Sequence, residues 1–181
     1  MDKSTPKIKA LIGLGNPSKQ YQNTYHNVGK KFVEYFASSE KAITKFLQPS
    51  NKNFEYCQLS DKLLIIPMTF MNESGLAVKQ AAAYFKLKPE EILVVHDDSD
   101  QNLGNFKIAF DQRSAGHHGI QSIIDHLKTQ KFWRLKIGIR PAQEAVRQKA
   151  EKFVLKKISK KDVTDLDLIF EEIIYKLKNV S

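Results

Sequence analysis

The sequence predicts an α/β fold in which helices cover both faces of a mixed, twisted β-sheet. Apolar runs of strand length alternate along the chain with amphipathic segments of helical period, the pattern of a sheet with helices packed on it. The chain has 181 residues, which suits one domain with a sizeable core and is cramped for two. No repeat, low-complexity segment or Pro/Gly/Ser-rich linker divides it, so we expect residues 1–181 to form a single domain.

Six segments have the composition of strands: residues 8–14, 53–58, 62–66, 91–96, 105–110 and 133–139. The second and third of these are expected to form a hairpin. Residues 91–96 (EILVVH) are a short apolar run, which indicates a buried central strand. The last two segments alternate between apolar and polar side chains, as half-exposed strands do.

Four segments are predicted to be helical: residues 28–38, 74–86, 118–128 and 159–178. In the second of them, we expect Leu76 and Val78 to lie on the apolar face. Ser159 is the expected N-cap of the last helix, with Asp162 three residues further on.

Charge is the strongest compositional signal. The formal net charge is +9 and the isoelectric point is near 9.5, which favours an anionic partner such as nucleic acid, although a generally basic proteome is the simpler alternative. Residues 128–161 hold twelve Lys or Arg and only two Glu. A face with this bias binds phosphates without reading sequence.

The remaining composition excludes two classes of protein. The single cysteine, Cys57, cannot form an internal disulfide, so a disulfide-stapled secreted domain is excluded. The first residues lack the long apolar core of a signal peptide, and the longest apolar stretch is too short to cross a bilayer. We therefore expect a cytoplasmic protein without a membrane partner.

Polar side chains follow three of the predicted strands: Asn16, Asn72 and Asp97. In open α/β sheets the carboxyl ends of strands carry the active site. His26 precedes the first predicted helix, where the helix dipole disfavours protonation of an imidazole, so it can act as a base near neutral pH. A carboxylate such as Asp97 can accept an imidazole N–H and fix its tautomer. The simpler alternatives are that His26 and Asn72 only cap helices.

Two motifs invite other interpretations. Gly13 and Gly15 begin a dinucleotide-type glycine loop, but Ser18 stands in the place of its third glycine and Pro17 lacks an N–H, so nucleotide binding is disfavoured. The acidic run His96–Asp100, with help from His117 and His118, is a candidate metal site for a phosphoesterase. Its ligands are adjacent in sequence rather than spread as compact metal sites usually need, so we regard it as the weaker hypothesis.

Five motifs taken together resemble bacterial peptidyl-tRNA hydrolases: GLGNPSKQYQNTYHNVG, PMTFMNESGLAV, ILVVHDDSD, SAGHHGI and RLKIGI. They occur in that family's order and spacing over about residues 8–175. The resemblance implies a monomeric, single-domain α/β enzyme that needs no metal or cofactor. It also implies hydrolysis of the ester joining a peptide to the 3′ ribose of tRNA. A catalytically silent RNA-binding relative is the alternative, but such a protein would have no need to keep a base paired with a carboxylate.

The resemblance also implies residue roles. His26 falls on the general base that activates water, and Asp97 falls on the aspartate that orients it. Asn16 and Asn72 fall on asparagines that hold the peptide end and the attacking water. Tyr21, Phe70 and Met71 fall on residues that line the substrate groove. His117 matches the histidine of the family's G-H-N-G, and Lys107 and Lys136 match basic positions.

The sequence departs from the family pattern in several places. Tyr25 replaces an arginine before the catalytic histidine, which removes a positive charge. His118 replaces an asparagine that contacts the tRNA end and helps to orient water, a role that a neutral imidazole can also take. Arg113 lies where the family is rich in glycine, and we expect it to supply phosphate contacts. Ala109 occupies a position where the family has a basic residue.

Overall fold

A mixed six-stranded sheet forms the centre of the computed structural model, which describes residues 7–40, 45–141 and 153–179. The strands are β1 (Ala10–Gly13), β2 (Phe54–Gln58), β3 (Leu63–Pro67), β4 (Ile92–Asn102), β5 (Phe106–Phe110) and β6 (Trp133–Arg140), in the order β2-β3-β1-β4-β6-β5. The four inner strands run parallel, whereas β2 and β5 pair antiparallel at the two edges. The predicted mixed sheet and its hairpin are confirmed.

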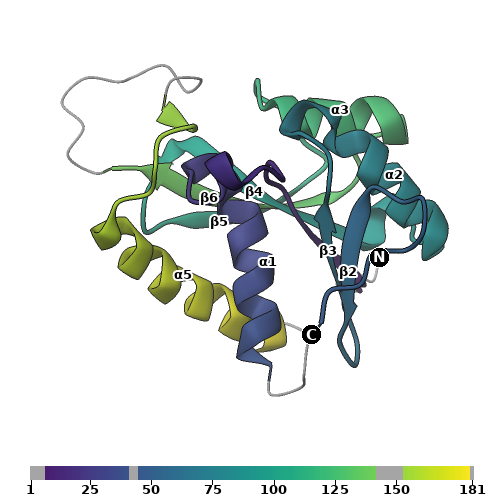
Figure 1. The fold of residues 1–181 in the computed structure, drawn as a ribbon, viewed down its shortest axis with the longest axis horizontal. Coiled ribbons are helices and arrows are strands. Elements are labelled where there is room, and N and C mark those ends of the chain that lie inside the picture. Colours follow the sequence, from purple (N-terminus) through teal and green to yellow (C-terminus); the bar gives the residue numbers. More distant parts are fainter. Residues whose placement is uncertain (1–6, 41–44, 142–152, 180–181) are drawn as a thin grey trace, which may run out of the picture.

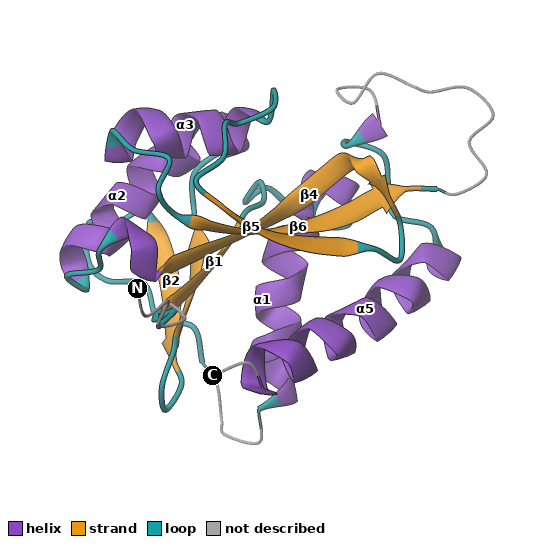
Figure 2. Ribbon diagram, turned by 180° about the vertical axis from the view of Figure 1, so that it is seen from behind, coloured by secondary structure: helices purple, strands orange, loops and turns teal. Residues whose placement is uncertain are grey.

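Helices cover both faces of this sheet, as predicted (Figures 1 and 2). They are α1 (Val28–Ser39) and α5 (Lys160–Asn179) on one face, and α2 (Ser74–Tyr84) and α3 (His118–Leu127) on the other. Neighbouring residues of β1 show why two cores form: Leu11 packs with the α1 and α5 side chains, and Ile12 packs with those of α2 and α3. None of the described helices combines the length and apolarity that a bilayer crossing requires.

Short 3-10 helices connect several of these elements: η1 (Lys19–Tyr21), η2 (Tyr25–Asn27), η3 (Met71–Glu73) and η4 (Pro89–Glu91). Two of them matter for the site, because η2 leads directly into α1 and η3 leads directly into α2.

The predicted apolar face of α2 was partly wrong. Leu76 is 40% exposed, whereas Ala77, Val78 and Ala81 are fully buried. The reason is close packing between α2 and α3. The backbone N–H of Gly75 donates to Ser122 Oγ (3.0 Å), and a Cβ at position 75 would lie 2.0 Å from the Ser122 carbonyl oxygen. Because the two helices approach this closely, α2 turns the face with small side chains toward α3 and leaves Leu76 exposed.

Strand β4 is longer than its apolar run indicated. It continues through Asn102, so Asp97 lies inside the strand, opposite Ile137 of β6, rather than in a loop after it. The polar residues of β4 are therefore held by the parallel pairing with β6, which continues to Gly138 before the register shifts. A carboxylate within a paired strand is placed more rigidly than one in a loop.

The start of α1 lies against β4 at Gly29. A Cβ on this residue would be 2.1 Å from the Val95 carbonyl oxygen, far inside van der Waals contact. His26 lies three residues before Gly29, and Asp97 lies two residues after Val95. This close approach of helix and strand therefore brings the two candidate site residues together.

We expect the variant Gly29→Ala to be less stable than the wild type. Alanine improves helix propensity by about 1 kcal/mol, but a Cβ against a backbone oxygen forces α1 away from β4, and overpacking costs about 1–3 kcal/mol. Urea denaturation would measure the difference in the free energy of unfolding. Glu34→Ala, on the exposed side of the same helix, is the control and should change it by no more than about 0.5 kcal/mol. Equal stability of Gly29→Ala and wild type would show that the contact imposes no constraint.

Candidate active site

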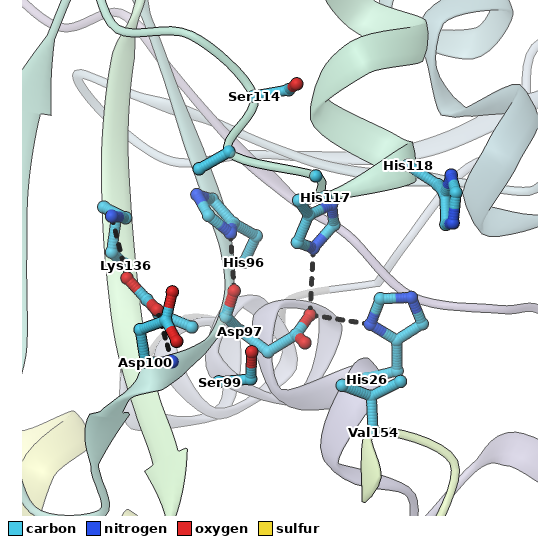
Figure 3. Close-up of a pocket in the computed structure, with 13 residues that line it drawn as sticks. His26, His96, Asp97, Ser99, Asp100, Ser114, His117, His118, Lys136 and Val154 are labelled. Atoms are coloured by element: carbon cyan, nitrogen blue, oxygen red, sulfur yellow. Dashed lines mark hydrogen bonds and ion pairs between the residues drawn. The ribbon is translucent and has the colours of Figure 1, made fainter. Parts of the chain in front are cut away.

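A cavity of about 410 Å³ opens beside β4, between η2, the start of α3 and β6 (Figure 3). It is lined by residues from five parts of the chain: His26; His96, Asp97, Asp98, Ser99 and Asp100; Ser114, Ala115, Gly116, His117 and His118; Lys136; and Val154. Of the residues that the sequence singled out, the structure thus gathers His26, Asp97, His117, His118 and Lys136 around one space.

Asp97 is the centre of this group. Its side chain is 2% exposed, and one oxygen, Oδ1, lies 2.8 Å from His26 Nδ1 and 3.1 Å from His117 Nε2. His117 Nδ1 accepts a hydrogen bond from the backbone N–H of Ile120 (3.3 Å), so its proton must be on Nε2, which donates to Asp97. His26 likewise donates from Nδ1, which leaves the lone pair of its Nε2 free to take a proton.

The electrostatics of the pair differ from the expectation for His26. Burial lowers the pKa of His26, but the charge of Asp97 and the hydrogen bond to it outweigh burial, so the pKa lies above the ordinary 6.5. The predicted suppression of protonation by the helix dipole was wrong, because a full charge in hydrogen-bond contact exceeds the partial charge of a helix end. Burial alone would raise the pKa of Asp97, yet His26 and His117 hold it well below its usual range.

His96 supports the site without facing solvent. It is 2% exposed, its Nδ1 donates to the backbone oxygen of Asp97 (2.7 Å), and its ring meets His117 edge-on with centroids 4.7 Å apart. Burial and the neighbouring His117 lower the pKa of His96 to about 3, so it stays neutral. His96 therefore shapes the wall against which His117 is held.

The candidate metal cluster of the acidic run is not what the fold assembles. Among the described residues, the atoms that lie within 4.8 Å of one another belong to His26, Asp97 and His117. A metal ion there would replace two N–H protons and force the His117 proton onto Nδ1, which already accepts from Ile120. The tautomers therefore fit a hydrogen-bond network better than a set of metal ligands.

Asn16 joins the loop after β1 to both 3-10 helices. Its side-chain Oδ1 accepts from the backbone N–H of Met71 (2.8 Å), and its backbone exchanges two hydrogen bonds with the Asn27 side chain (2.8 and 3.0 Å). Asn16 does not line the cavity, but it fixes Asn27, the neighbour of His26. Its Oδ1 is thus engaged by the Met71 N–H, and Nδ2 is the donor group of this side chain.

The other predicted groove residues lie outside the cavity lining. Met71 is buried, and its sulfur would be 2.5 Å from a Cβ at Gly119, which places it against the first turn of α3. Phe70 is 48% exposed and Asn72 is exposed, whereas Tyr21 is half-buried in η1. Met71 thus contacts the helix that carries His118, whereas Tyr21, Phe70 and Asn72 lie outside the lining of the cavity.

Comparisons with known proteins identify the family and the fold. The family model of peptidyl-tRNA hydrolases matches residues 10–181. The chain belongs to the peptidyl-tRNA hydrolase family. The Persephonella marina peptidyl-tRNA hydrolase is 41% identical over 174 residues (96% of this chain, 90% of the relative), and the enzyme of Francisella tularensis is 38% identical over 164 residues (90% and 85%). The crystal structure of Acinetobacter baumannii peptidyl-tRNA hydrolase superimposes with a TM-score of 0.83 at 29% identity, covering 98% of this chain and 90% of that one.

Membership of the peptidyl-tRNA hydrolases identifies the chain as a hydrolase. Two departures from the family pattern acquire a place in the structure. His118 is exposed in the first turn of α3 and lines the cavity, so its imidazole is available to a ligand. Tyr25 is 4% exposed, and its hydroxyl donates to Asp162 of α5. Position 25 therefore carries a buried structural side chain here rather than a surface charge.

The basic residues of the predicted phosphate-binding face are not equivalent. Arg134 is 1% exposed and donates from Nη2 to the Arg113 carbonyl oxygen (2.9 Å), so it supports the loop before His117 and does not reach a ligand. Lys136 lines the cavity but pairs with Asp98 (2.8 Å). Lys107 and Arg113 are exposed. Arg147, Lys149 and Lys152 of the basic stretch lie outside the described residues.

Sequence reasoning missed Val154. Its carbonyl oxygen accepts from the backbone N–H of His26 (2.8 Å), and its side chain lines the cavity next to His26. The one sequence signal was an apolar run, Phe153, Val154 and Leu155, within an otherwise basic stretch. Nothing in that signal indicates which distant segment the run would meet.

We expect Asp97→Asn to lower the pKa of His26 from above 6.5 to below it, because the raising effect of the carboxylate is lost while burial still disfavours the charged ring. The shift of the imidazole Cε1 proton of His26 with pH, followed by NMR, measures this. Asp100→Asn removes a negative charge from the same cavity wall and leaves the His26 hydrogen bond in place, so its His26 titration should resemble that of the wild type. A pKa that stays above 6.5 in Asp97→Asn would refute this account.

Proposed function

We propose that this chain hydrolyses the ester bond between the peptide and the 3′ ribose of peptidyl-tRNA, with His26 as the general base. The observation that carries the proposal is the hydrogen bond of 2.8 Å between His26 Nδ1 and the buried Asp97 carboxylate, at the wall of an open cavity. This pair fixes the tautomer that leaves His26 Nε2 unprotonated and directed away from Asp97 (Figure 3).

The reaction needs no covalent nucleophile. A water molecule bound at His26 Nε2 gives up a proton to the imidazole as its oxygen attacks the ester carbonyl, and Asp97 stabilises the imidazolium that forms. The same proton then passes to the departing 3′ oxygen of the ribose. An ester is easier to cleave than an amide, so one base, one orienting carboxylate and a few donors suffice.

Two sources of donors are proposed for the developing oxyanion. Asn16 Nδ2 is one, because its partner oxygen already accepts from Met71. The backbone N–H groups of the first turn of α3, at His118 and Gly119, are the others, since helix N-termini carry unpaired N–H groups that suit an anion. His118 takes the place of the family's asparagine in orienting water or the tRNA end.

The surrounding residues divide between the two ends of the substrate. Phe70, Asn72 and Tyr21 are assigned to the peptide end. Lys107, Arg113 and Lys136 are assigned to the phosphates of the tRNA, with Arg113 and Lys107 as the exposed contacts. In this proposal the enzyme acts as a cytoplasmic monomer and uses no metal or other cofactor.

The variant His26→Ala should lose turnover of N-blocked aminoacyl-tRNA by a factor of about 10² to 10⁴, the usual contribution of a general base, while tRNA affinity stays near the wild-type value. Release of labelled peptide measures turnover, and filter binding measures affinity. His126→Ala is the matched control and should keep wild-type turnover, because His126 lies near the far end of α3, where its Nδ1 donates to the Ser122 carbonyl oxygen (2.9 Å).

Two further readouts sharpen this test. The wild-type rate should rise as the pH passes the His26 pKa, above 6.5, because only the neutral ring accepts the proton. Activity should persist in EDTA, whereas a metal-dependent phosphoesterase would stop. Near-normal turnover by His26→Ala would refute the assignment of His26 as the base. If the wild type binds tRNA but does not hydrolyse the ester, the chain is an RNA-binding relative without this activity.

Lys107→Glu should weaken tRNA binding and reduce the slope of log affinity against log salt by about 1. The reason is that binding with one phosphate contact fewer releases fewer counterions from the tRNA. Turnover at saturating substrate should change little. Lys45→Glu is the control: it makes the same charge change near β2, at the sheet edge opposite β5. If the two variants show the same salt slope, the charge of β5 has no special role in holding the tRNA.

A further inference from the structure

The backbone around His26 is paired with a segment from the far end of the chain. Residues 153–158, the strap, lie between β6 and α5 in sequence and beside residues 23–26 in space. Three hydrogen bonds join the two segments: Tyr25 N–H to the Lys156 oxygen (3.2 Å), His26 N–H to the Val154 oxygen (2.8 Å) and Ile158 N–H to the Asn23 oxygen (2.8 Å). The position of His26 therefore depends on where the strap is held.

Tyr25 makes the side-chain contacts of this junction. It is 4% exposed, and its ring stacks on Phe153 of the strap with centroids 4.7 Å apart and an interplanar angle of 24°. Its hydroxyl donates a hydrogen bond to Asp162 Oδ2. Burial and the Asp162 carboxylate raise the pKa of Tyr25 to about 12, so the hydroxyl keeps its proton at any working pH.

Asp162 in turn belongs to a firmly anchored helix. Its backbone N–H donates to the N-cap oxygen Ser159 Oγ (3.1 Å), which confirms the predicted cap and sets Asp162 in the first turn of α5. One side of α5 is apolar and is buried against α1 and the sheet: Leu166, Ile169, Phe170, Ile173 and Ile174. Phe170 meets Phe32 of α1 edge-on, with centroids 5.3 Å apart. The hydrogen bond from Tyr25 thus ends on a part of the molecule that the core holds in place.

We propose that Tyr25 is a positioning residue for His26: its hydrogen bond to Asp162 and its stack on Phe153 tie η2 to α5 and keep His26 within hydrogen-bond distance of Asp97. This rests on the proposed role of His26 as base. His26 follows Tyr25 directly, so a shift of the backbone at Tyr25 also moves His26. A general base loses efficiency quickly when it is displaced from its productive position. The tyrosine that replaces the family's arginine therefore acts on catalysis through the position of its neighbour.

The test uses the full chain and the variant Tyr25→Phe, which keeps the stacked ring and removes only the hydroxyl. We expect kcat to fall roughly tenfold, less than the hundredfold that a misplacement of an ångström costs, with KM unchanged. Asp162→Ala removes the acceptor instead and should give the same loss. The double variant should be no worse than either single one. Asp162→Asn keeps an oxygen acceptor and should retain most of the activity.

Tyr35→Phe is the matched control. The Tyr35 hydroxyl also donates to a carboxylate of α5, Glu171 (3.1 Å), and its ring also packs against an α5 aromatic residue, Phe170 (5.5 Å). The tether is of the same kind, but it starts from the middle of α1 rather than beside His26. We therefore expect wild-type kcat from Tyr35→Phe.

An NMR titration of His26 gives a second readout that does not depend on turnover. The titratable groups that face His26 are Asp97 and His117, and neither is changed in these variants. Loosening of the His26–Asp97 contact should move the His26 titration to lower pH in Tyr25→Phe and not in Tyr35→Phe.

Wild-type kcat together with a wild-type His26 titration in Tyr25→Phe would overturn the positioning role, as would equal losses from Tyr25→Phe and Tyr35→Phe. Absence of hydrolysis by the wild type would instead overturn the proposed function, and the titration would still decide whether Tyr25 positions His26. If Tyr25→Phe does not fold, Asp162→Ala tests the same hydrogen bond by removing its acceptor instead of its donor.

Discussion

One carboxylate oxygen, Oδ1 of Asp97, accepts hydrogen bonds from two histidines of different elements, and the rest of the site is arranged around that fact. A buried carboxylate is costly unless it is paired, so His26 and His117 are both drawn to the same point of β4. His26 comes with η2 and α1, and His117 comes with α3. Helices from opposite faces of the sheet thus meet over one charged atom, and the cavity is the space left between them.

The sequence was informative wherever a local pattern carries the structure. Strand and helix periods located the strands and α1, α2, α3 and α5. Polar residues after predicted strands led to Asn16 and Asp97, and the position before the first predicted helix led to His26. It was less informative about how far an element extends. Asp97 to Asn102 have no apolar character, yet they are strand because β6 lies beside them. Pairing with a distant strand is a property of the fold and leaves no trace in the composition of β4.

Charge and side-chain burial were the other points at which local reasoning failed. Arg134 looks like its neighbours in a basic stretch, but the loop at Arg113 covers it, and its guanidinium supports the backbone there. The pKa of His26 depends on a carboxylate that lies 71 residues away in sequence. The start of α1, which is close to His26 in sequence, suggested instead that this pKa would be lowered. Long-range partners decided both outcomes, and a single sequence does not show which partners meet.

The strap gives the molecule a particular order of assembly. The strap is distant in sequence from the His26 segment that it holds, and contacts between such distant segments close late in folding because the entropy of a long loop must be overcome first. All six strands of the sheet, including β4 with Asp97, precede the strap in the sequence. We therefore expect the sheet to hold the Asp97 carboxylate in place before the strap fixes the backbone of His26.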